Sequence, residues 1–120
     1  MILCSGKVYF DLLEAREKMR RDDIILYRIE QLYPFPAKTL ARHLSRFKNA
    51  NKLVWCQEEP QNMGCWNHVE RYINRTLEYI KAKSKKITYS GRIPSASPAT
   101  GYLKKHLAQQ EEIVTKAITI

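Results

Sequence analysis

Short continuous apolar runs alternate along the chain with longer segments in which apolar residues recur every three or four positions. The short runs predict strands buried on both faces, whereas the recurring positions predict amphipathic helices. The predicted strands cover residues 1–4, 24–29, 52–56 and 86–90. The apolar positions of the four helices that follow them are, in chain order, Val8, Leu12, Leu13 and Ala15; Leu40, Leu44 and Phe47; Val69, Tyr72, Ile73, Leu77 and Ile80; and Leu103, Leu107, Ile113 and Val114.

Turn-forming residues separate these elements. Pro34 and Pro36 end the second strand before its helix, and a polar loop at residues 57–62 follows the third strand. The loop IPSASPATG leads into a last helix that begins at Pro98 or Thr100 and runs to the C-terminus. Strand and helix therefore alternate from one end of the chain to the other.

This alternation predicts an α/β fold. Each helix needs a sheet face on which to bury its apolar stripe, and strands joined through helices run parallel. We expect three layers, with a mostly parallel sheet of about four strands between helices on both faces. No linker or internal repeat divides the chain, so residues 1–120 are predicted to form a single domain. The first predicted strand begins at Met1, so an upstream edge strand would be missing if the parent protein is longer.

Composition supports a globular domain and raises one further possibility. Hydrophobic residues make up 44% of the 120 positions, enough to form a core, and the net charge is +9. Phosphate backbones attract clustered cations, so nucleic-acid binding is one hypothesis. The positive residues are spread out, however, with local concentrations at 18–21 and 81–86, where helices are predicted to end. Cations suit helix ends, so solvated helix ends are the favoured interpretation.

The three cysteines, Cys4, Cys56 and Cys65, are an odd number without close pairing. They are interpreted as reduced, buried thiols. The histidines form no metal-binding motif with them, so no metal site is predicted. No apolar run is long enough to span a bilayer, and no leader pattern follows Met1, so neither a membrane span nor a signal peptide is predicted.

Two polar segments follow strands and could carry chemistry. Ser5, Gly6 and Lys7 lie at a strand-to-helix turn, where free N–H groups can hold an anion. The turn matches no nucleotide-binding motif, and simple capping of the helix by Ser5 is the favoured alternative. Glu58 and Glu59 follow the third strand, where a structural role for the loop is favoured over catalysis.

Five bulky aromatic residues near strand ends and loops could belong to the core or to an interface. Tyr33 and Phe35 flank a proline and are the best interface candidates. For Trp55, Trp66 and Tyr102 the core is favoured.

Four segments together carry a family resemblance: CSGKVYFDL, RIEQLYPFP, WCQEEPQNMG and SASPATGYLKKH. In order and spacing they resemble the C-terminal domain of the thiamine-dependent, decarboxylating component of 2-oxoglutarate dehydrogenase. The resemblance covers almost the whole chain. It implies a transketolase C-terminal-like fold with strand order 2-1-3-4, which agrees with the predicted alternation.

The resemblance also implies a function for the complete parent enzyme. That oxidoreductase binds thiamine diphosphate and Mg²⁺, decarboxylates 2-oxoglutarate and passes the succinyl group to the lipoyl arm of the succinyltransferase component. The domains upstream hold the cofactor, and no GDG-type thiamine motif appears in these 120 residues, so no cofactor is expected here. The parent is a homodimer, in the bacterial cytoplasm or the mitochondrial matrix.

Two functional hypotheses remain open. In the first, the chain is a non-catalytic domain for assembly or dimerisation, with a regulatory role if an effector such as AMP or acetyl-CoA binds; Ser5, Lys7, Arg92 and Lys104 are candidate contacts, chosen for charge and loop position. In the second, it is a stand-alone α/β module that binds a nucleotide or phosphorylated metabolite at the turn of residues 5–7.

Overall fold

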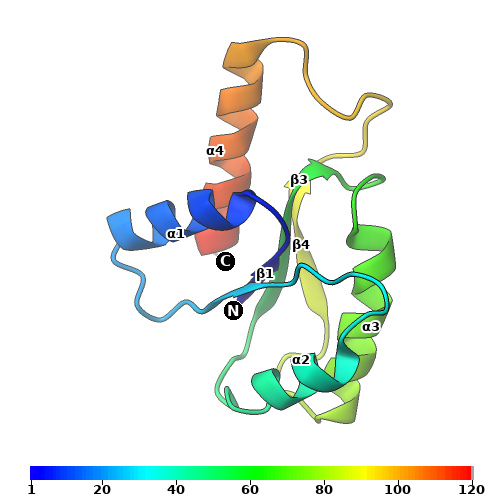
Figure 1. The fold of residues 1–120 in the computed structure, drawn as a ribbon. Coiled ribbons are helices and arrows are strands. Elements are labelled where there is room, and N and C mark those ends of the chain that lie inside the picture. Colours follow the sequence, from blue (N-terminus) through cyan, green and yellow to red (C-terminus); the bar gives the residue numbers. More distant parts are fainter. Residues whose placement is uncertain (120) are drawn as a thin grey trace.

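Four parallel strands and four helices make up the computed structural model, which describes residues 1–119 (Figure 1). In chain order the elements are β1 (Ile2–Cys4), α1 (Val8–Lys18), β2 (Leu26–Arg28), α2 (Ala37–Leu44), β3 (Leu53–Pro60), α3 (Trp66–Tyr79), β4 (Ile87–Arg92) and α4 (Leu103–Thr119). The sheet order is β2-β1-β3-β4, and every pairing is parallel. The predicted α/β fold and strand order are confirmed.

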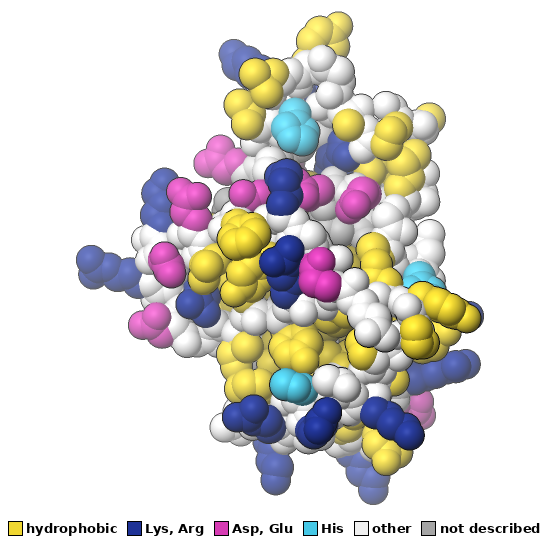
Figure 2. All heavy atoms as spheres, viewed as in Figure 1, with side chains coloured by type: hydrophobic (Ala, Val, Ile, Leu, Met, Phe, Trp, Pro, Cys, Tyr) yellow, Lys and Arg dark blue, Asp and Glu magenta, His cyan; other side chains and the backbone are white. Residues whose placement is uncertain are grey.

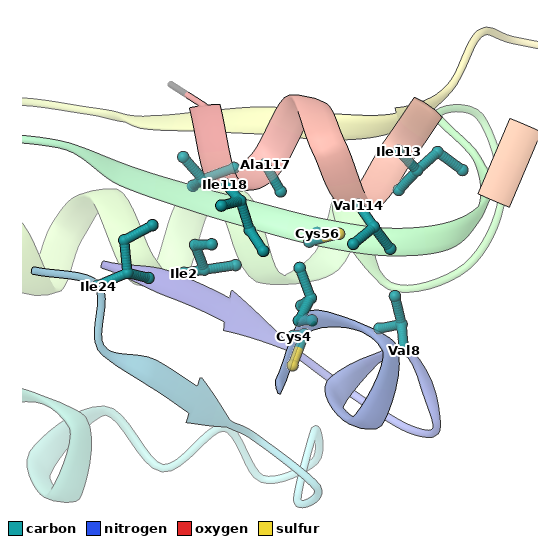
Figure 3. Close-up of a cluster of buried hydrophobic side chains, with 11 residues drawn as sticks. Ile2, Cys4, Val8, Ile24, Cys56, Ile113, Val114, Ala117 and Ile118 are labelled. Atoms are coloured by element: carbon teal, nitrogen blue, oxygen red, sulfur yellow. The ribbon is translucent and has the colours of Figure 1, made fainter. Parts of the chain in front are cut away.

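Helices cover both faces of the sheet, as Figure 1 shows. Because successive side chains of a strand point to opposite faces, Ile2 and Cys4 pack with α1 and α4, whereas Leu3 packs with α2 and α3. β3 divides in the same way, with Val54 and Cys56 on the first face. Figure 3 shows the cluster under α1 and α4. Two apolar layers therefore hold the sheet at its centre.

Three predicted strands have different bounds in the structure, and one of them, β4, continues through Arg92, two residues beyond the predicted 86–90. β3 continues through Pro60, so residues 57–60, which the sequence predicts to be loop, belong to the strand. The side chain of Gln57 is buried there with hydrogen-bond partners, which makes a polar residue compatible with a central strand. β2 is shorter than residues 24–29 and only partly buried, because it lies at the edge of the sheet.

Two predicted helices also differ. Phe47 lies beyond the end of α2 instead of on the helix. Leu103 and Leu107, predicted as apolar contacts of the last helix, are 73% and 59% exposed. The buried part of α4 starts only at Ile113, and Figure 1 shows the first half of this helix standing away from the sheet. An apolar side chain on that half has no sheet beneath it.

α1 and α3 end in the same way. Arg20 and Lys81 both have φ of 51°, the left-handed conformation that usually follows a helix. After α3, the N–H of Ala82 donates to the carbonyl of Leu77 at 2.9 Å, and that of Lys81 to Glu78 at 3.0 Å. This pair of bonds is a Schellman motif, and it turns the chain sharply toward β4. Within residues 1–119, no helix is both long and apolar enough to cross a membrane.

Candidate functional site

The turn of residues 5–7 and the end of β3 meet at the carboxyl edge of the sheet. α1 leaves β1 toward one face and α3 leaves β3 toward the other, so this is the switch point at which α/β sheets usually bind ligands. Lys7 bridges it, with Nζ 2.6 Å from Glu58 Oε1 and 3.7 Å from Asp11 Oδ2. The hydrogen bond that Lys7 donates to Glu58 raises the pKa of Lys7. The cation that could hold a ligand anion is thus paired within the protein.

The backbone of the same turn is also engaged. The Gly6 N–H donates to Glu30 Oε1 at 3.0 Å, and Arg28 Nε donates to the same oxygen at 2.6 Å. The Gly6 bond, followed by that of Arg28, holds the pKa of Glu30 below its usual value. Ser5 does not cap α1, because the N-cap residue is Lys7 and no side chain makes a capping bond. The favoured alternative of capping by Ser5 was therefore wrong, and a carboxylate of the protein occupies the anion position.

Arg92 and Lys104 have different surroundings. Arg92 Nε donates to the carbonyl of Glu58 at 2.7 Å, and its guanidinium also bonds the carbonyl of Pro98. Arg92 lines a cavity of about 360 Å³ beneath the segment that connects β4 to α4. Lys104 does not line this cavity, whereas Lys105 and Gln109 do. Arg92 therefore lies at the carboxyl edge of the sheet, whereas Lys104 lies on the exposed start of α4.

Gln109, one of the residues that line this cavity, carries a buried atom that is unpaired within the described residues. Its Oε1 is buried and has no hydrogen-bond partner among residues 1–119. A buried acceptor without a hydrogen-bond donor lowers the stability of the fold.

Gln57 organises the end of β3, which the sequence did not reveal. Its Oε1 accepts from Trp55 Nε1 at 3.0 Å and from the Trp66 backbone N–H at 3.1 Å. Its Nε2 donates to the carbonyls of Met63 at 2.8 Å and Pro60 at 3.1 Å. One amide thus ties the strand to the start of α3. The only signal in the sequence is a polar residue directly after the apolar run of the strand.

The two acidic residues beside it differ in burial. Glu58 is half-buried and pairs with Lys7, whereas Glu59 is exposed and its carbonyl accepts from the Tyr89 hydroxyl at 3.1 Å. Their side chains point apart, so no paired carboxylates form here.

The aromatic candidates fall into three situations. Trp55 and Trp66 are buried, as predicted, but Tyr102 is 78% exposed, so its predicted place in the core was wrong. Tyr33 is 85% exposed, whereas Phe35 stacks on Tyr72 with ring centroids 5.1 Å apart.

The thiols are not poised for reaction. Cys4 and Cys56 are buried, and burial raises the pKa of Cys4 to about 12 and raises that of Cys56 as well. Cys65 is half-buried, with a pKa that burial also raises. Over the described residues 1–119, no three His, Cys, Asp or Glu side chains lie close enough together to hold a metal ion.

Residues 1–118 match the protein family described as 2-oxoglutarate dehydrogenase C-terminal. The chain belongs to this family. Similar proteins include the 2-oxoglutarate dehydrogenase E1 components of Brucella anthropi, Brucella ovis and Brucella canis, each 53% identical over 118 residues. The matched segment covers 98% of this chain and 12% of each relative, so the chain spans about an eighth of their length.

The four segments that resemble 2-oxoglutarate dehydrogenase meet at one place in this domain. They are residues 4–12, 28–36, 55–64 and 95–106, and each follows or includes the carboxyl end of a strand. The bonds described above join the first three, and Asn62 exchanges two hydrogen bonds with the backbone of Ser95, at 2.9 and 3.0 Å, to join the fourth. Hydrogen bonds and a salt bridge thus connect all four segments into one polar network.

Proposed function

We propose that this chain is the assembly domain of a homodimeric, thiamine-dependent 2-oxoglutarate dehydrogenase E1 component. The observation that carries the proposal is an exposed group of apolar side chains, which we call the apolar end. It consists of Ile93, Tyr102, Leu103 and Leu107, which are 81%, 78%, 73% and 59% exposed. These residues come from the first half of α4 and the segment before it, next to the polar network.

Large apolar side chains that share one end of a domain usually mark a contact surface, whereas scattered ones need no explanation. The relatives of the family are about eight times longer than this chain, so the remainder of such an enzyme offers a surface to cover the apolar end. A helix half whose apolar side chains are exposed gains stability when a neighbour covers them. Assembly is the role that this arrangement fits best.

The residues of this chain do not fit the cofactor of the complete enzyme. Thiamine diphosphate would need a diphosphate position and a Mg²⁺ site with oxygen ligands. The Gly6 N–H of the turn already donates to Glu30, and within residues 1–119 no metal-binding group of side chains forms. We therefore assign the cofactor, and with it decarboxylation and succinyl transfer to the lipoyl arm, to the preceding part of the enzyme.

A regulatory role has one observation in its favour, the cavity lined by Arg92, Lys105 and Gln109. Its two cationic side chains suit an anionic effector such as AMP or acetyl-CoA. The stand-alone module has less support, because both Gly6 and Lys7 already have acidic partners.

A chimeric enzyme tests the assembly role. The segment of the Brucella anthropi E1 component that matches this chain, 53% identical over 118 residues, is replaced by this chain. In this chimera, Leu103→Glu with Leu107→Glu is expected to weaken the dimer and to lower turnover of 2-oxoglutarate, because two charges would enter an apolar contact. Light scattering and a coupled assay of turnover are the measurements.

Tyr79→Glu is the matched control, since Tyr79 is 82% exposed and lies outside the apolar end. In the isolated 120-residue chain the double variant should leave the melting temperature unchanged, because both leucines are exposed there. A dimer as stable as the unmodified chimera would contradict the assembly role. Turnover by the isolated chain with 2-oxoglutarate, thiamine diphosphate and Mg²⁺ would contradict its non-catalytic character.

A further inference from the structure

A basic surface forms at the amino edge of the sheet, opposite the apolar end. The connection between α2 and β3 carries three of its cations and the connection between α3 and β4 carries four. They are Arg46, Lys48, Lys52, Lys81, Lys83, Lys85 and Lys86, and we call them the basic rim. All seven are exposed, and within residues 1–119 none of them makes a salt bridge. Figure 2 shows Lys and Arg side chains gathered at this lower end of the molecule.

An apolar groove lies beside three residues of the basic rim, Lys48, Lys81 and Lys83. Its cavity is about 350 Å³, between the end of α2, the end of α3 and the start of β3. Leu44, Phe47 and Ile80 contribute apolar lining, and Lys48, Lys81 and Lys83 line the same cavity. The groove is thus apolar inside and positively charged around its mouth, a combination suited to one kind of ligand.

Helix ends do not account for the whole basic rim. Lys81 follows α3 in the Schellman motif, where the carbonyl ends of the helix stabilise a cation. That effect fades within one helical turn, and Lys85 and Lys86 lie beyond it. Bringing seven unpaired cations together costs electrostatic free energy, so an anionic partner would relieve a repulsion that the isolated domain retains.

We propose that this groove binds an acidic, amphipathic segment of a partner protein, with carboxylates on the basic rim and an apolar side chain in the groove. The rim supplies the charge complementarity and the groove the burial that anchors one side chain. A nucleic acid fits less well. Single-stranded nucleic acids stack their bases on exposed aromatic side chains, whereas the interior of this groove is aliphatic except for the half-buried Phe47. The inference is independent of the assembly role, because it concerns the opposite end of the domain.

Fluorescence anisotropy with defined probes tests the proposal on the 120-residue chain. The first probe is a labelled amphipathic helix of Glu and Leu of about four turns. The second has the same charge with Ser in place of Leu, and the third is a short duplex DNA. We expect saturable binding of the Glu-Leu peptide, at least about fivefold tighter than the Glu-Ser peptide, and about tenfold weaker when ionic strength rises from about 0.05 to 0.3 M.

Two variants test separately how the charge of the basic rim and the shape of the groove contribute to binding. Lys48→Glu with Lys83→Glu should weaken Glu-Leu binding at least about tenfold. Ser45→Trp adds bulk at the exposed edge of the groove. This variant should bind the Glu-Leu peptide more weakly and bind the Glu-Ser peptide with unchanged affinity. Lys18→Glu with Arg20→Glu is the matched control, with the same charge change at the end of α1, and should have little effect.

Four results would overturn the proposal. They are absence of binding by the Glu-Leu peptide, equal affinity for the two peptides, tighter binding of DNA than of either peptide, and an unchanged affinity in the Lys48→Glu, Lys83→Glu variant while its circular dichroism remains that of the wild type.

Discussion

Replacing Gln57 with methionine would remove one buried amide and keep the length of the side chain. Gln57 is 3% exposed, and its Oε1 accepts from both Trp55 and Trp66. In the Gln57→Met variant the Trp55 indole N–H and the Trp66 backbone N–H lose their acceptor in a buried position. The carbonyls of Pro60 and Met63 lose a donor as well, although each retains a second site for another bond.

The expected loss of stability follows from the buried N–H groups that lose their acceptor. A buried donor without a partner costs about 1–3 kcal/mol, so two donors predict a loss of about 2–6 kcal/mol. Domains of this size are commonly stable by about 5–15 kcal/mol. The variant should therefore fold with a clearly lower midpoint, or remain largely unfolded at 37 °C.

Urea denaturation followed by far-ultraviolet circular dichroism measures this loss, because the signal does not depend on the indole that the change affects. Gln61→Met is the matched control. Its side chain makes no hydrogen bond with the described residues, so its free energy of unfolding should stay within about 0.5 kcal/mol. A loss below about 1 kcal/mol for Gln57→Met would show that water or repacking replaces the amide and would refute the reasoning.

Three further outcomes follow from the structure. The Gly6 N–H holds the pKa of Glu30 below its usual 4.5, so Glu30 stabilises the fold above that pH and this contribution is lost as pH falls; Glu30→Gln should flatten the decline of stability in acid denaturation. Arg20 has φ of 51°, and Arg20→Gly should raise the free energy of unfolding by about 1 kcal/mol in urea, whereas Arg20→Ala should not. Burial of Cys4 and Cys56 and the raised pKa of each thiol should leave both unreactive toward a disulfide reagent at pH 8 until urea unfolds the chain.

Local pattern was sufficient for the architecture. The run at residues 52–56 predicted a strand, because a strand buried on both faces is apolar throughout. The spacing of Val69, Ile73 and Leu77 predicted a helix, because a helix that buries one face repeats its apolar positions about every 3.6 residues. The alternation then predicted the parallel sheet, and the four quoted segments predicted the family. The end of β3 was predicted too early because the polar Gln57 is buried there, with hydrogen-bond partners between residues 55 and 66.

The positions of the candidate residues depended on contacts distant in sequence. The turn at residues 5–7 looked suited to an anion, but Glu30 and Glu58 lie 24 and 51 positions from their partners Gly6 and Lys7, beyond the reach of any local pattern. Tyr102 was predicted in the core because it is aromatic, yet the first half of α4 extends past the sheet and leaves it exposed.

The positively charged residues show most clearly what the sequence determined and what the tertiary structure decided. By itself the sequence determined the net charge of +9, the number of cations and their separation into groups along the chain. Only the tertiary structure decided that residues 46–52 and 81–86 lie at one edge of the sheet, where Lys48, Lys81 and Lys83 line one groove. The physical reason is that successive strands of a parallel sheet start at the same edge, so connections about 30 residues apart in the chain become neighbours there.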